Sequence, residues 1–225
     1  MKILITSGPV DVSIDSVRRI SNSASGKTGN DLAVAFSRRG HQGFLLTSRP
    51  PNIKIDSWII QEYHEYHELH HSIANLLLTD RFDAIIMSAA VSDYLFDGYS
   101  AHIDDEFSKF EPKIPGHLPE IFLRLKAAPR LVEMIRTDWK FSGYLVIFKL
   151  ECGISVDELF KRAERLRRKS GADLVVANMA ESSSREAWYG AGDKSMFIHV
   201  CRENLAETLA NAVETGVRNK CPGSY

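Results

Sequence analysis

The sequence is poor in cysteine and has no long apolar run. Its 3 cysteines, Cys152, Cys201 and Cys221, lie far apart and outside any C-x-x-C pattern, which argues against a disulfide framework and a zinc cluster. No stretch approaches the ~18 apolar residues of a membrane-spanning helix. The apolar run at residues 3–5 is too short for a signal-peptide core. We therefore predict a soluble, cytoplasmic protein that does not contact membranes.

A charge imbalance is also missing. With 28 lysines and arginines against 29 aspartates and glutamates, the net charge is -1, which excludes a broad nucleic-acid-binding surface and leaves room only for a local basic site. The chain is 44% hydrophobic and 25% charged, a composition typical of a globular protein with a sizeable core. Because neither a repeat nor a linker interrupts it, we predict one domain over residues 1–225.

Short apolar runs alternate with amphipathic stretches along most of the chain. Predicted strands cover residues 2–7, 43–47, 57–60, 83–87, 143–151 and 173–178, and a hairpin covers 188–200. Predicted helices cover residues 29–39, 69–77, 128–137, 156–169 and 203–218. This order predicts an α/β fold with a Rossmann-like parallel sheet and helices on both faces. Glycine and proline interrupt the pattern between about 95 and 126, which predicts a β excursion or a flap.

Residues 18–29 separate the first strand from the first helix and combine positive charge with small polar side chains. Arg18, Arg19 and Lys27 carry the charge. Ser25 and Gly26 precede a helix whose first N–H groups lack intrahelical partners and attract anions. The residues leave two interpretations open: an anion site, or a solvated loop that ends in an ordinary serine N-cap.

Two further candidates follow the predicted strand 83–87. Ser88, Ala89 and Asp93 come at its carboxyl end, where ligands bind in open α/β sheets. Asp93 could accept hydrogen bonds from a ribose, or it could cap a turn. Lys113, in the irregular segment, could close on a phosphate or serve only solubility.

Histidines gather between residues 64 and 71. His67 and His71 are four residues apart, a spacing that can bind zinc on a helix. Because no third ligand is specified, we expect an exposed first helical turn here rather than a metal site.

Two common nucleotide-binding motifs are missing. Residues 26–28 match the end of a P-loop, but Ser21 stands where its first glycine belongs, and the first strand ends about twenty residues too far upstream. The G-x-G-x-x-G fingerprint is also absent after that strand, which argues against an NAD(P)-dependent oxidoreductase. A nucleotide, if bound, is held in another way.

Several motifs occur together in the order seen in one enzyme family. They comprise residues 3–8, 14–18, 20–22, 25–29, 89–94, 113–114, Phe148 with Glu151, and 173–178. In this respect the chain resembles phosphopantothenate-cysteine ligases, also called phosphopantothenoylcysteine synthetases, from about residue 2 to residue 215. The resemblance implies an amide ligase of coenzyme A biosynthesis. Such enzymes activate 4'-phosphopantothenate with CTP or ATP, usually with Mg2+, form an acyl-nucleotidylate and pyrophosphate, and then transfer the acyl group to L-cysteine.

The resemblance also implies roles for individual residues. Asn22 holds the acyl-nucleotidylate, Arg18 contacts phosphate, and Lys113 serves the triphosphate and the formation of the intermediate. The implied nucleotide site comprises Ser88, Ala89, Asp93, Lys113, Ala128, Pro129 and Phe148. The implied phosphopantothenate site comprises Arg18, Asn22, Ser25, Gly26 and Lys27. The family further implies a homodimer and, because no decarboxylase half precedes Met1, a free-standing ligase beside a separate flavoprotein decarboxylase.

The sequence departs from the family pattern at two places. Pro9 replaces a glycine after the first strand and removes a backbone donor. Leu166 and Ser170 stand where bacterial members often carry lysines that reach the triphosphate, although Arg165, Arg168 or Lys169 could replace them. These departures leave open a second hypothesis, a catalytically silent relative that binds a nucleotide or a pantothenate derivative as a regulatory module.

Overall fold

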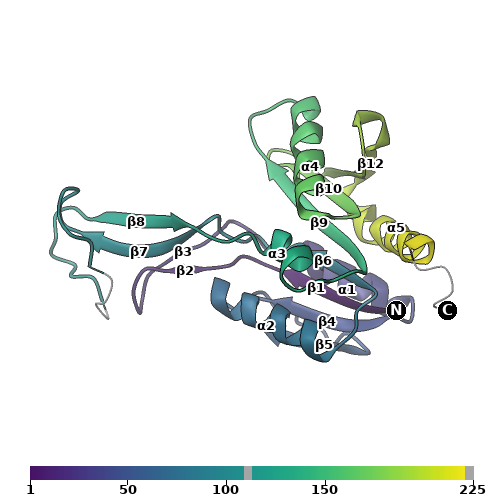
Figure 1. The fold of residues 1–225 in the computed structure, drawn as a ribbon, viewed down its shortest axis with the longest axis horizontal. Helices are drawn as coiled ribbons and strands as arrows, with labels where there is room; N and C mark the ends of the chain where they lie inside the picture. The colour runs from purple at the N-terminus through teal and green to yellow at the C-terminus, as the bar shows by residue number, and fades with distance from the viewer. Residues whose placement is uncertain (109–112, 221–225) are drawn as a thin grey trace.

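An eight-stranded sheet forms the centre of the fold (Figure 1). The computed structural model describes residues 1–108 and 113–220. The strand order is β12-β11-β10-β9-β6-β1-β4-β5, and all neighbours from β10 to β5 pair in parallel. The parallel strands are β1 (Lys2–Ser7), β4 (Gln42–Thr47), β5 (Trp58–Glu62), β6 (Ala84–Met87), β9 (Tyr144–Glu151) and β10 (Leu174–Met179). The predicted hairpin adds the antiparallel strands β11 (Glu186–Gly190) and β12 (Ile198–Cys201).

Helices cover both faces of the sheet and produce two separate cores. α1 (Lys27–Arg38) and α5 (Leu205–Lys220) cover one face, and α2 (Tyr66–Thr79), α3 (Leu131–Thr137) and α4 (Val156–Ser170) cover the other. Side chains alternate between the faces, so Ile3 and Ile5 enter the α1–α5 core while Leu4 enters the opposite one. The predicted Rossmann-like fold is confirmed. Within the described residues, no helix has the length and apolarity needed to cross a membrane.

The order of the strands reverses direction between β1 and β6. From β1 the chain passes to β4 and β5 on one side, and then returns to β6, β9 and β10 on the other. In open α/β sheets, the carboxyl ends of the strands at such a switch point form the ligand-binding crevice. The fold therefore places the candidate site beyond Ser7 and Met87, where β1 and β6 end.

Two hairpins extend away from the sheet (Figure 1). The predicted excursion contains β7 (Tyr94–Ser100) and β8 (Phe122–Ala127), which pair in antiparallel fashion. Beside it lies a short hairpin of β2 (Val12–Ser13) and β3 (Arg19–Ile20), which the sequence did not predict. Residues 18–20 therefore belong to a hairpin and not to the loop before α1.

Most predicted boundaries agree with the structure to within a few residues, but α3 begins at Leu131 rather than at residue 128. The N–H of Ala128 donates instead to the carbonyl of Asp93, which keeps that segment outside the helix. α2 begins with a capping box of Glu65 and Glu68, so the histidines lie on its first turns. Among the described residues, no set of three histidine, cysteine, aspartate or glutamate side chains is arranged to hold a metal.

The buried carboxylate of Glu164 fixes α4 to the turn before β12. It accepts hydrogen bonds from Arg167, from Arg168 and from the N–H of Gly192. The bonds from Arg167 are the main cause that lowers the pKa of Glu164 to about 2. A lowered folded-state pKa stabilises the fold above the unfolded value, and this contribution is lost as the pH falls from about 5 toward 2.

We expect Glu164→Gln to destabilise the protein at pH 7 by up to about 3 kcal/mol, the equivalent of that pKa shift. The loss should shrink at pH 3, where the wild-type contribution has itself begun to disappear. Urea unfolding at both pH values measures the difference. Glu62→Gln, at an exposed position on β5, serves as the control and should change little. An equal loss at pH 7 and pH 3 would contradict the assigned electrostatic role.

Candidate functional site

The first turn of α1 packs directly on the ends of β1 and β6. A Cβ atom at Gly29 would lie 2.5 Å from the Cβ of Ser7 and 2.8 Å from the hydroxyl of Ser88, so only glycine fits. Gly26 occupies the N-cap with a left-handed φ of 75° and offers no capping side chain. The N-terminus of α1 therefore brings the positive end of a helix dipole to the switch point.

The chain after β6 runs alongside the chain after β1. The Ser88 hydroxyl donates to the carbonyl of Thr6 over 2.6 Å, and the N–H of Ala89 lies 3.2 Å from the Thr6 hydroxyl. The N–H of Ala90 donates to the carbonyl of Gly8 over 2.9 Å. Ser88 and Ala89 thus lie at the carboxyl edge of the sheet, where the strand order predicts a ligand.

Asn22 belongs to this strand-end group. Its side-chain amide donates to the carbonyl of Ala90 over 2.9 Å, although the two residues are 68 positions apart. The side chain is exposed. The bond to Ala90 uses one N–H and leaves the side-chain oxygen and the second N–H directed to no other described residue. Asn22 can therefore both donate to and accept from a ligand between α1 and the end of β6.

The remaining candidates for nucleotide binding surround the same edge. Ala128 donates its N–H to the carbonyl of Asp93 over 2.8 Å, and the carbonyl of Pro129 accepts from the Tyr66 hydroxyl over 2.8 Å. The Asp93 side chain is exposed. Phe148 follows Ile147, which pairs with Met87 at the end of β6, and its half-buried ring packs against the α1–α5 core. The segment after β6 and the segment after β8 thus meet through the bond between Asp93 and Ala128, and Phe148 lies one residue beyond the pairing of β9 with the end of β6.

Pro9 does not remove a donor from the side of the chain that pairs with Ala90. The carbonyl of Gly8 and the N–H of Val10 both bond Ala90, so the backbone of Pro9 faces the opposite side. There its carbonyl accepts from the Ser48 hydroxyl over 2.6 Å. The proline ends the pairing of β1 with the chain after β4. The hydrogen bonds to Ala90, which also accepts from Asn22, do not involve the nitrogen of Pro9.

Arg18 and Lys113 form a second group, on the hairpins. The fully buried carboxylate of Asp15 accepts from the guanidinium of Arg18 over 3.0 Å and from the N–H of Ile114 over 3.0 Å. Arg18 also donates to the carbonyl of Ile114 over 3.1 Å, which brings it beside the exposed Lys113. Backbone hydrogen bonds, first that of Val17, lower the pKa of Asp15. The structure thus divides residues 18–29, because Arg18 contacts the Lys113 segment while Asn22 contacts the strand ends.

Sequence reasoning missed two residues of these groups. Asp15 is the acceptor that joins the β2–β3 hairpin to the β7–β8 hairpin. Its place at a turn was the only sequence feature that could have pointed to this role. Arg49 follows β4, and its Cβ lies 3.1 Å from the position that a Cβ on Gly26 would take. Its carbonyl accepts from the amide of Asn30 over 2.9 Å. Arg49 therefore adds a positive charge beside the N-terminus of α1. Its place just after a predicted parallel strand was the sequence feature that could have identified it as a site residue.

The helix positions at which the family carries lysines lie at the wrong end of α4 to reach this site. Leu166 and Ser170 are near its C-terminus, which precedes Asp173. Asp173 accepts from the N–H of Leu145 at the amino end of β9, so this end of α4 lies at the opposite edge of the sheet. Two of the proposed replacements are engaged there, Arg168 with Glu164 and Lys169 with Glu133. The absent lysines therefore do not weaken the strand-end site.

Residues 1–213 match the family model described as the DNA/pantothenate metabolism flavoprotein C-terminal domain. The chain belongs to this family. A curated member, the coenzyme A biosynthesis bifunctional protein CoaBC of Thermococcus kodakarensis, is 26% identical over 219 residues, which cover 95% of this chain and 51% of the relative. The CoaBC protein of Methanocaldococcus jannaschii is 29% identical over 188 residues, 79% of this chain and 40% of the relative. The chain thus spans about half the length of the curated relatives it matches.

Solved structures of the family share the fold. The DNA/pantothenate metabolism flavoprotein from Streptococcus pneumoniae superposes with a TM-score of 0.83 at 26% identity, covering 96% of this chain and 99% of that chain. A Cab2 mutant in complex with phosphopantothenate-cysteine has a TM-score of 0.76 at 14% identity, and the match covers 97% of this chain and 87% of that chain. These matches confirm the family resemblance predicted from the motifs.

Proposed function

We propose that the chain is a phosphopantothenate-cysteine ligase. One observation carries the proposal: Asn22 bonds Ala90 at the point where the open N-terminus of α1, suited to a phosphate, meets the strand-end segment from Ser88 to Asp93, suited to a nucleotide. Family membership supports the proposal, as do the names of the curated relatives, which refer to coenzyme A biosynthesis.

The proposed chemistry has two steps. A carboxylate oxygen of 4'-phosphopantothenate attacks the α-phosphorus of a nucleoside triphosphate, and the bond to pyrophosphate breaks. The cysteine amine then attacks the acyl carbon, and the nucleoside monophosphate leaves as the amide forms. Asn22 would hold the intermediate with its free donor and acceptor, since preorganised donors stabilise charge that develops in a transition state. Ser25, Gly26, Lys27 and Arg49 would receive the phosphate of phosphopantothenate at the start of α1.

CTP or ATP would lie across the ends of β6 and β9. Ser88 and Ala89 would support it, Asp93 would bond the ribose, and Ala128, Pro129 and Phe148 would border the base. Arg18 and Lys113 would serve the phosphates; the Asp15 carboxylate holds Arg18 and also accepts from the N–H of Ile114, next to Lys113.

Mg2+ is expected with the triphosphate. The described residues form no three-ligand metal cluster, so the phosphates would supply most of its ligands, as is usual for this ion. When bound, it would neutralise charge between the reacting anions.

We further propose a homodimer that assembles through the hairpins, a separate flavoprotein decarboxylase as functional partner, and a cytoplasmic location. The hairpins expose large apolar side chains, among them Tyr94 at 54% and Ile20 at 41% of their surface. Where exposed apolar side chains join into one patch, the surface is typical of protein–protein contacts, and we propose that those of the hairpins do so.

The test is product formation from phosphopantothenate and cysteine, with CTP and ATP supplied separately. We expect one nucleoside monophosphate and one pyrophosphate per amide formed, and no product from pantothenate, which lacks the phosphate. Nucleotide binding without amide formation would select the silent regulatory relative instead. Failure of a folded preparation to bind any nucleotide would refute both.

A further inference from the structure

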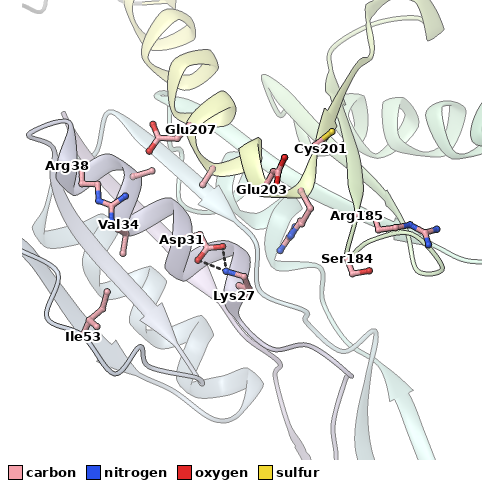
Figure 2. A pocket seen from close by; sticks show the side chains of 13 residues that line it. Lys27, Asp31, Val34, Arg38, Ile53, Ser184, Arg185, Cys201, Glu203 and Glu207 are labelled. Carbon is pink, nitrogen blue, oxygen red and sulfur yellow. Dashed lines mark hydrogen bonds and ion pairs between the residues drawn. The ribbon is translucent and has the colours of Figure 1, made fainter.

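A cleft of about 870 Å3 lies between α1, the start of α5 and the turn before β11 (Figure 2). It is separate from the strand-end group, with which it shares only Lys27 among the residues assigned above. Four cationic side chains line it: Lys27, Arg38, Arg185 and Arg202. None of the ion pairs found among residues 1–108 and 113–220 includes Arg38, Arg185 or Arg202.

Arg202 is the most buried of these cations, since Lys27, Arg38 and Arg185 are all exposed. It is half-buried, and its guanidinium donates to the hydroxyl of Thr28 in the first turn of α1. Burial lowers the pKa of Arg202, an effect that the charge of Asp31 partly offsets. A guanidinium stays charged in proteins and carries five N–H donors, so a half-buried one is costly unless acceptors surround it. Among the described residues, the Thr28 hydroxyl is the one acceptor found for the Arg202 guanidinium. The open cleft leaves space for a ligand that supplies a second acceptor.

Lys27 brings further charge to the Arg202 end of the cleft, since it precedes Thr28 in the first turn of α1. The N–H of Arg202 donates to the carbonyl of Arg185 over 2.7 Å, but the Arg185 guanidinium points away from Lys27 (Figure 2). Lys27 contacts Asp31 over 2.8 Å in an exposed pair, which contributes little and leaves the ammonium available. Glu203 also lines this end, without an ion pair to a described residue. Arg38 lies at the far end, beyond Asp31 (Figure 2).

We propose that Arg202, with Lys27, binds a phosphate group in this cleft. The planar fork of an arginine accepts phosphate oxygens in pairs, and lysine adds a point charge. A phosphate bound here would compete with Thr28 for the Arg202 donors and would therefore affect the first turn of α1. The ligand is a separate anion such as inorganic phosphate or pyrophosphate, because the phosphate of phosphopantothenate is assigned to Ser25, Gly26 and Arg49. The site does not depend on the proposed ligase function.

The test is a titration of the full chain with inorganic phosphate, followed by backbone amide NMR. Arg185 and Arg202 report on the cleft, whereas Asn22 and Ser25 report on the start of α1. We expect Arg202→Met to weaken the binding seen at the cleft amides at least tenfold while the shifts of Ser25 persist, and Arg202→Lys to have an intermediate effect. Arg38→Met, at the far end of the same cleft, is the matched control and should bind as wild type.

Wild-type binding by Arg202→Met, or an equal loss in Arg38→Met, would overturn the proposal. If Arg202→Met does not fold, the exposed Lys27→Met replaces it, with an expected several-fold loss of the binding seen at the cleft amides. Kinetics test whether the ligand is separate from the substrate. Noncompetitive inhibition by phosphate with respect to phosphopantothenate supports a separate ligand, and a raised KM for phosphopantothenate in Arg202→Met would overturn it. Because the titration needs no turnover, an inactive ligase and an empty cleft are distinguishable.

Discussion

Replacing Asn22 with alanine is expected to slow amide formation by about 100- to 1,000-fold, the usual cost of removing a preorganised donor at a reacting centre. The side chain is exposed and contributes one hydrogen bond, to Ala90, so the fold should survive its loss. The KM values for nucleotide and phosphopantothenate should change much less than kcat, because the helix terminus and the strand ends remain. Steady-state kinetics, with each substrate varied in turn, measure the separate changes in kcat and KM.

Ser23→Ala is the matched control for Asn22. Ser23 lies one residue along the same exposed loop, and no side-chain hydrogen bond is found for it in the described structure. We expect its kinetics to equal those of the wild type. Unchanged turnover in Asn22→Ala would refute the role assigned to Asn22, and a loss of folded protein would show that its bond to Ala90 is structural.

Substituting Gly29 by alanine should both destabilise the protein and damage the site. The added Cβ would approach the Cβ of Ser7 to 2.5 Å, and the backbone of β1 holds that atom in place. Overpacking of this kind typically costs about 1–3 kcal/mol. Since α1 can relieve the clash only by moving off the strand ends, we also expect a large rise in KM for phosphopantothenate. Urea unfolding and kinetics well below the melting temperature measure the two effects.

Alanine substitutions at two other glycines separate the loss of stability from the rise in KM. A Cβ at Gly216 would lie 2.2 Å from the ring of Tyr144, so Gly216→Ala should destabilise the fold while KM stays unchanged. A Cβ at Gly116 would contact nothing within 4 Å, and that substitution should be nearly neutral for stability. If Gly29→Ala matched the wild type in both measurements, the close packing of α1 on the sheet would not matter to the site.

The sequence predicted the layered part of the fold because burial leaves a clear pattern there. Parallel strands buried on both faces appear as continuous apolar runs, and this applies to β1, β6 and β10. The hairpin of β2 and β3 escaped prediction because each strand has 2 residues, too few to show a period. The start of α3 was misplaced because the bond between Ala128 and Asp93 depends on tertiary structure.

The same distinction applies to the candidate site. Ser88, Ala89 and Asp93 could be selected from sequence because ligands in open α/β folds bind beyond the carboxyl ends of the parallel strands. The direction of Arg18 could not, since its carboxylate partner Asp15 also bonds Ile114, 99 residues further along the chain. The roles of individual side chains in the ligase reaction stay predictions until the variants are measured.

The strand order has a consequence for how the protein forms during synthesis. The neighbours β5, β4, β1 and β6 all lie within the first 87 residues, so half of the sheet can pair before the second half leaves the ribosome. That half carries Asn22 and the first turn of α1, and Ser88 follows it directly. The exposed edge of β6 then awaits β9, which ends at Glu151. A nascent chain that pauses before this point presents an unpaired parallel edge next to its unfinished candidate site, and this is where a chaperone would be most needed.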